Sequence, residues 1–130
     1  MIVLDACVMI AHFDENDVHH GQAGRLLADL DVEPAIMSPL SRAEVLVAPA
    51  RAGRRRAIED AMDRIDIAVD DLPGNAAGQL AELRAHTGLK LPDCCVLLTA
   101  ERHGPAEIAT FDTRLARVAV ERGLVVRPEA

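Results

Sequence analysis

Short apolar runs alternate along the chain with segments of helical periodicity, and this alternation constrains the fold more than any other feature. The apolar runs that predict strands are 1–5, 34–38, 66–72, 106–112 and 124–127. The segments that predict helices are 6–13, 17–30, 38–48, 54–65, 75–88, 91–104 and 113–123. Strands that alternate with helices predict a three-layer α/β/α sandwich around a central, mainly parallel sheet of four to five strands. Because no linker, repeat or low-complexity stretch interrupts the pattern, we expect residues 1–130 to form one domain.

The composition argues against two common ways of binding nucleic acid. The chain has no Trp or Tyr and only two Phe, so bases cannot stack on a row of aromatic side chains. Its formal net charge is −7, whereas a domain that binds nucleic acid by charge alone is basic. Clustered carboxylates can nevertheless hold metal ions, which invert the local field. A nucleic-acid substrate therefore remains compatible with this sequence if the acidic residues bind metal.

The three cysteines, Cys7, Cys94 and Cys95, fit neither a disulfide framework nor a zinc site by their spacing. The apolar start lacks the basic region of a signal peptide, Asp5 interrupts it, and it is too short to span a bilayer. We therefore expect a reduced, soluble, cytoplasmic protein that has no contact with a membrane.

Two acidic residues stand at the ends of predicted strands. Asp5 follows the apolar run MIVL, and Asp112 closes the run AEIATF. Ligands of open α/β sheets bind outside the carboxyl ends of the strands. If the two strands are close neighbours, Asp5 and Asp112 meet at one edge of the sheet.

Two further acids lie on helices whose apolar residues share their face. Glu44 shares a face with Leu40 and Val47, and Asp93 with Val96 and Leu97, so both are expected to point inward. Several buried carboxylates in one cavity repel one another strongly. A divalent cation such as Mg²⁺ or Mn²⁺ removes this repulsion and accepts hard oxygen ligands. Such an acidic cluster can carry metal-assisted hydrolysis of a phosphodiester.

Each acid also has a purely structural interpretation. Asp93 and Asp112 could be helix N-caps, a position at which Asp is favoured. Glu44 could pair with Arg42 or another arginine. Asp5 is the hardest of these acids to explain by structure alone.

The motifs around these acids resemble those of the PIN-domain ribonucleases, and most closely the VapC-type toxins of bacterial toxin–antitoxin pairs. The stretches that carry the resemblance, in chain order, are MIVLDACVMIA, SPLSRAEVL, AELRAHTGLKLPDCCVLLTA and IATFDTRLARVA. In the same order they place Asp5, Glu44, Asp93 and Asp112 in the four acidic positions of the family's site. The resemblance covers nearly the whole chain and implies a PIN-like fold.

The resemblance also implies an activity, a cofactor and partners. It implies an endoribonuclease that cleaves RNA with water activated by Mg²⁺ or Mn²⁺, with all four acids in the metal site. It further implies a homodimer and inhibition by a small cognate antitoxin. Many relatives have Thr-Ser or Thr-Asn after the first Asp, where this chain has Ala6 and Cys7. Cys7 and Thr110 are the side chains expected to support Asp5.

Other basic residues and other functions remain open at this point. Arg84 and Arg114 are candidates for contact with RNA or with the antitoxin, and the basic run RAGRRR (51–56) could contact either or be a solvated helix start. The alternative functions are a catalytically weak PIN-like module that binds RNA or a partner, and another metal-dependent phosphohydrolase.

Overall fold

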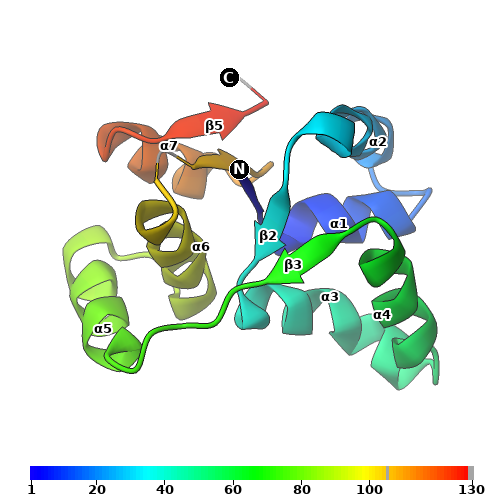
Figure 1. Ribbon diagram of the computed structural model, residues 1–130, viewed down its shortest axis with the longest axis horizontal. Helices are drawn as coiled ribbons and strands as arrows, with labels where there is room; N and C mark the ends of the chain where they lie inside the picture. The colour runs from blue at the N-terminus through cyan, green and yellow to red at the C-terminus, as the bar shows by residue number, and fades with distance from the viewer. Residues whose placement is uncertain (105, 129–130) are drawn as a thin grey trace.

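Five parallel strands form one sheet, which confirms the predicted mainly parallel sheet, and they lie in the order β3-β2-β1-β4-β5 (Figure 1). The computed structural model describes residues 1–104 and 106–128, with the side chains of residues 31 and 32 left aside. The strands are β1 (Ile2–Leu4), β2 (Ala35–Met37), β3 (Ile67–Val69), β4 (Glu107–Ala109) and β5 (Val125–Arg127). The helices are α1 (Ala6–Phe13), α2 (His20–Ala28), the 3₁₀ helix η1 (Asp29–Val32), α3 (Pro39–Arg51), α4 (Arg55–Arg64), α5 (Ala76–Thr87), α6 (Leu91–Arg102) and α7 (Thr113–Glu121).

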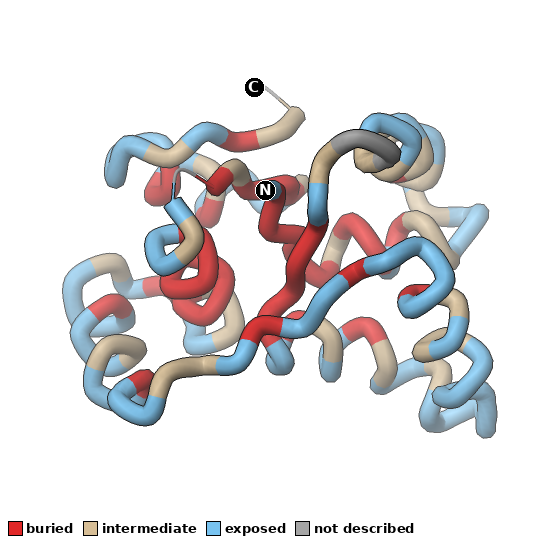
Figure 2. The backbone as a smooth tube through the Cα atoms, viewed as in Figure 1, coloured by how far each residue is buried: buried red, intermediate tan, exposed pale blue. Residues whose placement is uncertain are grey.

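The helices cover the sheet on both faces, so the three-layer α/β/α arrangement is confirmed (Figures 1 and 2). Alternate residues of the central strand point to opposite faces, as the pleat requires. Ile2 and Leu4 belong to a buried cluster with residues of α1, α2, α3 and α4. Val3 belongs to a second cluster with residues of α5, α6 and α7. Because both faces of β1 are buried, its side chains form the continuous apolar run seen in the sequence.

Local capping signals set several helix boundaries. The Ser38 hydroxyl accepts the Ser41 backbone N–H at 3.1 Å, and Pro39 occupies the first turn of α3. Gly88 ends α5 in the left-handed conformation with φ 72°. The helix predicted from residue 17 begins only at His20, because the Asp17 carboxylate instead accepts the His19 backbone N–H at 2.8 Å. Among the described residues, no helix has both the length and the apolar character that crossing a bilayer requires.

A buried ionic cluster joins the end of β3 to α6, and the sequence does not reveal it. Asp70 is only 4% exposed, although it lies in the polar stretch VDDLPG. Its carboxylate accepts hydrogen bonds from Thr99 at 2.9 Å and from Arg102 at 2.9 Å, and lies 3.1 Å from His103 Nε2. Burial opposes ionisation, but the bonds from His103, Thr99 and Arg102 prevail and hold the pKa of Asp70 below its usual range. His103, just after α6, therefore belongs to this cluster and is not a free surface residue.

We expect Asp70→Asn to lower the free energy of unfolding by about 2–3 kcal/mol, because an amide cannot satisfy three donors to a buried carboxylate. Urea denaturation at pH 7 measures the change. The neighbouring Asp71→Asn is the matched control, since the Asp71 side chain is exposed and only its backbone carbonyl accepts from Arg102.

The loss has a defined dependence on pH. Because the folded pKa of Asp70 lies below its ordinary value of 3.8, the carboxylate stabilises the fold above that pH, and the difference between Asp70→Asn and the parent narrows as the pH falls below it. Equal stability of the Asp70→Asn and Asp71→Asn variants at pH 7 would contradict this assignment.

Candidate active site

The first and fourth predicted site acids meet at the carboxyl edge of the sheet. β1 lies between β2 and β4, and the Asp5 backbone N–H donates to Ala109 O at 2.9 Å. Asp5 and Asp112 therefore follow adjacent parallel strands, as the sequence expects of near neighbours. The connections from β1 to β2 and from β4 to β5 run to opposite sides of this point. Parallel α/β sheets form their ligand-binding crevice at such a switch in strand order.

Three donors fix the Asp5 carboxylate, which is 7% exposed. The Ala6 backbone N–H donates to Oδ1 at 2.8 Å, so Asp5 is also the N-cap of α1. The Thr110 hydroxyl donates to Oδ2 at 2.6 Å, and the Cys7 thiol donates to the same oxygen at 3.3 Å. The expected hydrogen bond between Thr110 and the site is therefore present. Burial outweighs these bonds and raises the pKa of Asp5.

Thr110 and Cys7 also organise the backbone that leads to Asp112. The Thr110 hydroxyl accepts the Asp112 backbone N–H at 3.0 Å, and the Cys7 sulfur accepts the Phe111 backbone N–H at 3.3 Å. Burial, followed by the charge of Asp5, raises the pKa of the Cys7 thiol to about 12. The thiol is thus protonated at neutral pH and can act as a donor to Asp5.

Glu44 and Asp93 come from the helices that flank this edge, and their exposure differs from the prediction. Glu44 lies on the exposed face of α3 with Leu40 and Val47, whereas Ser41 and Val45 are the residues of α3 that are buried. The expectation that Glu44 points into the core is therefore wrong. The helices packed against α3, which are α1, α4 and α6, cover a narrower strip of it than its apolar residues suggest. Asp93 is half-buried in the first turn of α6.

Of the purely structural roles considered for Asp93, Asp112 and Glu44, helix capping and pairing with arginine, the structure shows only capping by Asp112. Asp112 is the N-cap of α7, because its Oδ1 accepts the Arg114 and Leu115 backbone N–H groups at 2.9 and 3.1 Å. Asp93 is not an N-cap, since Lys90 holds that position. Arg42 pairs with Asp63 at 2.9 Å and not with Glu44. A capping role explains only part of this group of acids.

The four carboxylates influence one another electrostatically. Burial, followed by the charges of Asp5, Asp112 and Glu44 in that order, raises the pKa of Asp93 to about 6, while Lys90 opposes the rise. Burial and the charge of Asp5 also raise the pKa of Glu44. All four acids therefore contribute to one negative site.

The donor set fits a hard divalent cation. Carboxylate oxygens are the ligands that Mg²⁺ and Mn²⁺ prefer, and a cation would relieve the repulsion that raises the pKa of Asp93. Within residues 1–104 and 106–128, no three His, Cys, Asp or Glu side chains are grouped closely enough to hold a metal ion as they stand. The carboxylates would therefore have to draw together around a shared ion.

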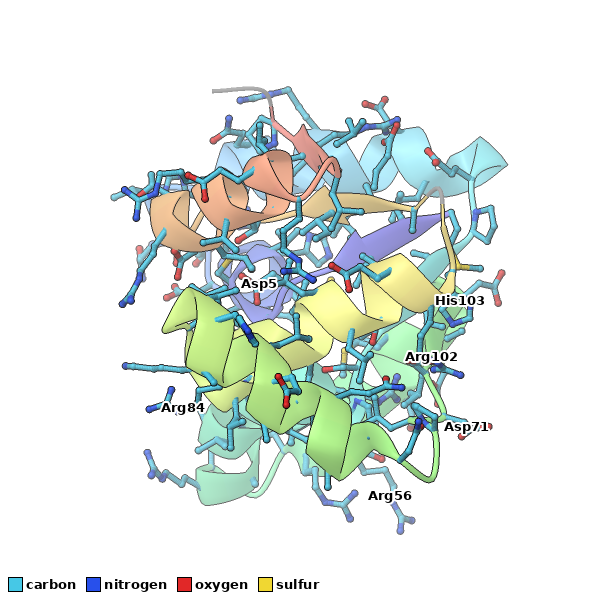
Figure 3. All side chains as sticks on the ribbon, turned by 90° about the vertical axis from the view of Figure 1, so that its left-hand side faces the viewer. Asp5, Arg56, Asp71, Arg84, Arg102 and His103 are labelled. Atoms are coloured by element: carbon cyan, nitrogen blue, oxygen red, sulfur yellow. The ribbon has the colours of Figure 1, made fainter. Side chains whose placement is uncertain are left out.

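The predicted contact residues Arg84 and Arg114 lie beside this site, on exposed positions of α5 and α7. Figure 3 shows Arg84 on the same side as Asp5, while Arg102 and His103 lie at the other end of α6. The ionic cluster around Asp70 is thus separate from the four site acids. In the sequence, the one signal that could have pointed to this cluster is the position of Asp70 directly after a strand.

The fold and the acidic edge together define an α/β protein with a carboxylate site at the switch in strand order. A sequence model of the PIN domain matches residues 2–121, and the chain therefore belongs to the PIN-domain family. No curated protein matches the sequence at a significant level.

Solved structures share the fold at low sequence identity. A toxin–antitoxin complex from Klebsiella pneumoniae is 22% identical with a TM-score of 0.73, over 89% of this chain and 90% of that one. VapC20 of Mycobacterium tuberculosis, a toxin that cleaves the sarcin–ricin loop, is 19% identical with a TM-score of 0.76, over 91% and 95%. FitAcB from Neisseria gonorrhoeae is 20% identical with a TM-score of 0.70, over 97% and 96%. The predicted PIN-like fold is confirmed.

We expect Asp93→Asn to stabilise the protein by on the order of 1 kcal/mol at pH 7.5, because the variant removes one of four mutually repelling charges. The folded pKa of about 6 lies above the ordinary value of 3.8, so the parent loses stability as the pH rises through this window and the gain vanishes below it. Thermal denaturation at pH 7.5 and at pH 3.5, without divalent cations, measures the difference. Asp60→Asn, at an exposed position of α4, is the control. A loss of stability on removal of Asp93 at pH 7.5 would show that the repulsion is absent.

We expect Thr110→Val to lower the free energy of unfolding by about 1–3 kcal/mol, since it leaves Asp5 Oδ2 without its shortest donor and the Asp112 N–H without an acceptor. The shapes of the two side chains are alike, so packing changes little. Thr113→Val, at an exposed position of α7, is the matched control and is expected to change stability by less than about 0.5 kcal/mol. Chemical denaturation measures the free energy of unfolding of both variants. Equal values for Thr110→Val and Thr113→Val would refute the role of Thr110.

Proposed function

We propose that the protein is a Mg²⁺- or Mn²⁺-dependent endoribonuclease that acts as the toxin of a toxin–antitoxin pair. One observation carries the proposal: four carboxylates from four separate segments, Asp5, Glu44, Asp93 and Asp112, gather at the carboxyl edge of a PIN-domain sheet, where burial and the charges of the other three raise the pKa of Asp93. Such a site attracts a divalent cation and, through it, the phosphate of a nucleic-acid strand.

The four carboxylates would hold the cation, which when bound supplies a Lewis acid for the phosphate and lowers the pKa of a coordinated water. The protein contributes the positions of the ligands. Thr110 and Cys7 hold Asp5 Oδ2 in one orientation, and the N-cap bonds of α7 hold Asp112. Hydrolysis by water breaks the bond between phosphorus and the 3′ oxygen, so the products are a 5′-phosphate and a 3′-hydroxyl.

The proposed partners are an RNA substrate, a small cognate antitoxin and a second copy of this chain in a homodimer. The likeness to the toxin–antitoxin complex of Klebsiella pneumoniae and to VapC20, the toxin that cleaves the sarcin–ricin loop, supports this assignment. A basic side chain of the antitoxin would suit the negative charge of the four acids. The proposal places the protein in the cytoplasm, where it would meet both RNA and antitoxin.

We expect Asp5→Asn and Asp93→Asn to reduce the cleavage of structured RNA by about 100-fold or more, because each removes a ligand of the cation. Gel analysis of 5′-labelled RNA with Mg²⁺ or Mn²⁺ measures the rate, and phosphatase treatment of the products tests for the 5′-phosphate. Asp60→Asn is expected to retain the parent rate. The Asp93→Asn variant is the more decisive, since it is expected to fold more stably than the parent.

Calorimetric titration with Mn²⁺ separates the proposal from its alternatives. If the protein is the proposed metal-dependent endoribonuclease, the parent binds Mn²⁺ and the Asp93→Asn substitution weakens that binding. A protein that binds RNA but neither binds Mn²⁺ nor cleaves is a binding module. If the RNA stays uncleaved with each divalent cation tested, the proposed activity is overturned.

A further inference from the structure

Three cationic side chains surround a single turn beside the acids. Arg84 lies in the last turn of α5, Lys90 is the N-cap residue of α6, and Arg114 lies in the first turn of α7. All three are exposed. They come from separate elements of a chain whose formal net charge is −7, so their proximity is not a consequence of a basic composition. We call Arg84, Lys90 and Arg114 the turn surface.

Both arginines of the turn surface are fixed to the same turn. Arg84 Nη1 donates to Leu89 O at 2.8 Å, and Arg114 Nη2 donates to the preceding carbonyl, Gly88 O, at 3.1 Å. Gly88 has φ 72°, and a Cβ atom there would lie 3.2 Å from Arg114 Nη2. The turn therefore accepts Arg114 closely because it carries a glycine in a conformation that disfavours other residues.

The turn surface adjoins the site acids at two points. Lys90 and Asp93 are three residues apart at the N-terminus of α6, and the charge of Lys90 opposes the rise in the pKa of Asp93. The Arg114 backbone N–H donates to Asp112 Oδ1 at 2.9 Å, which ties the base of this side chain to another site acid. Cations of the turn surface and the site acids Asp93 and Asp112 thus lie side by side at the N-termini of α6 and α7.

The turn-surface cations retain donors for an outside ligand. Among the described residues, Arg42, Arg55, Arg102, Arg122 and Arg127 each form an ion pair with a carboxylate. In the same part of the chain, no such pair involves the turn surface. A guanidinium has five N–H donors, and one bond to a carbonyl leaves the others available. Unpaired, exposed guanidiniums fixed by a backbone contact are suited to phosphate oxygens.

We propose that the turn surface binds the phosphates of an RNA strand next to the phosphate that is cleaved. This inference rests on the proposed function and names how the substrate is held. A polyanion approaching four carboxylates is repelled until cations offset that charge, and the turn surface places cations directly beside the acids. Backbone contact also suits a chain without Trp or Tyr, which cannot hold the strand by stacking on those side chains.

The test measures binding of a fluorescein-labelled single-stranded RNA of mixed sequence and about 12 nucleotides, in EDTA so that the strand stays intact. Fluorescence anisotropy at several salt concentrations gives the affinity and its salt dependence. The variant Arg84→Gln/Arg114→Gln keeps an N–H donor for each carbonyl and removes both charges. The matched control is Arg54→Gln/Arg56→Gln, which removes two exposed charges, one at the end of the turn between α3 and α4 and one at the adjoining start of α4. Figure 1 places that turn on the opposite side of the molecule from α5.

We expect the turn-surface variant to bind about tenfold more weakly and to lower the slope of log K against log salt by about 1.4, since each phosphate contact on a single strand contributes about 0.7. The control is expected to bind within about twofold of the parent. Lys90→Gln, which removes no side-chain bond to the turn, is expected to lower the slope by about 0.7 and does not depend on the folding of the double variant.

Equal losses in the turn-surface variant and the control would mean that net charge alone governs binding, and a larger loss in the control would move the contact to residues 54–56. Either result overturns the inference. Cleavage of RNA by the parent protein with Mn²⁺ is measured in parallel. If the parent cleaves RNA and either of these results is obtained, the turn surface fails while the proposed function stands. If the parent neither binds nor cleaves any RNA, both fail.

Discussion

The rest of this structure depends on one constraint, the placement of a buried carboxylate at the carboxyl edge of the sheet, close to three others. Asp5 is almost fully buried, and its three donors come from the first turn of α1 and from the end of β4. Those donors fix the direction of the carboxylate but do not offset the loss of hydration, because its pKa remains raised. The pairing of β1 with β4 and the N-terminus of α1 are both parts of this support.

The two buried acids that follow strands illustrate opposite solutions to the same problem. Asp70 is satisfied by an arginine, a threonine and a histidine, and its pKa is lowered, as expected of a group that stabilises the fold. Asp5 has donors but no cationic partner among the described residues, and the charged groups that interact with it are other carboxylates. A protein gains no stability from such an arrangement. The contrast identifies Asp70 as structural and supports a binding role for the edge that holds Asp5.

Much of the fold could be predicted from the sequence because its determinants are local. The apolar run of β1, the Ser38–Pro39 start of α3 and the Gly88 stop of α5 each act over a few residues. The exposure of Glu44 could not be predicted, since the apolar residues on its face of α3, Leu40 and Val47, remain 38% and 46% exposed. Asp70 was missed for a related reason: the residues that bury and pair with it lie about thirty positions away on α6.

The sequence by itself determined the order of strands and helices and the four acidic positions, because periodicity, capping and motif spacing are properties of neighbouring residues. Only the tertiary structure decided which acids lie close enough to interact electrostatically and which residues surround them. The bond from Thr110 to Asp5 joins residues 105 positions apart, and the carbonyls of Gly88 and Leu89 receive Arg114 and Arg84 from two different helices. Such contacts depend on how the sheet and its helices pack, because hydrogen bonds and charges act over a few ångströms in space whatever the separation along the chain.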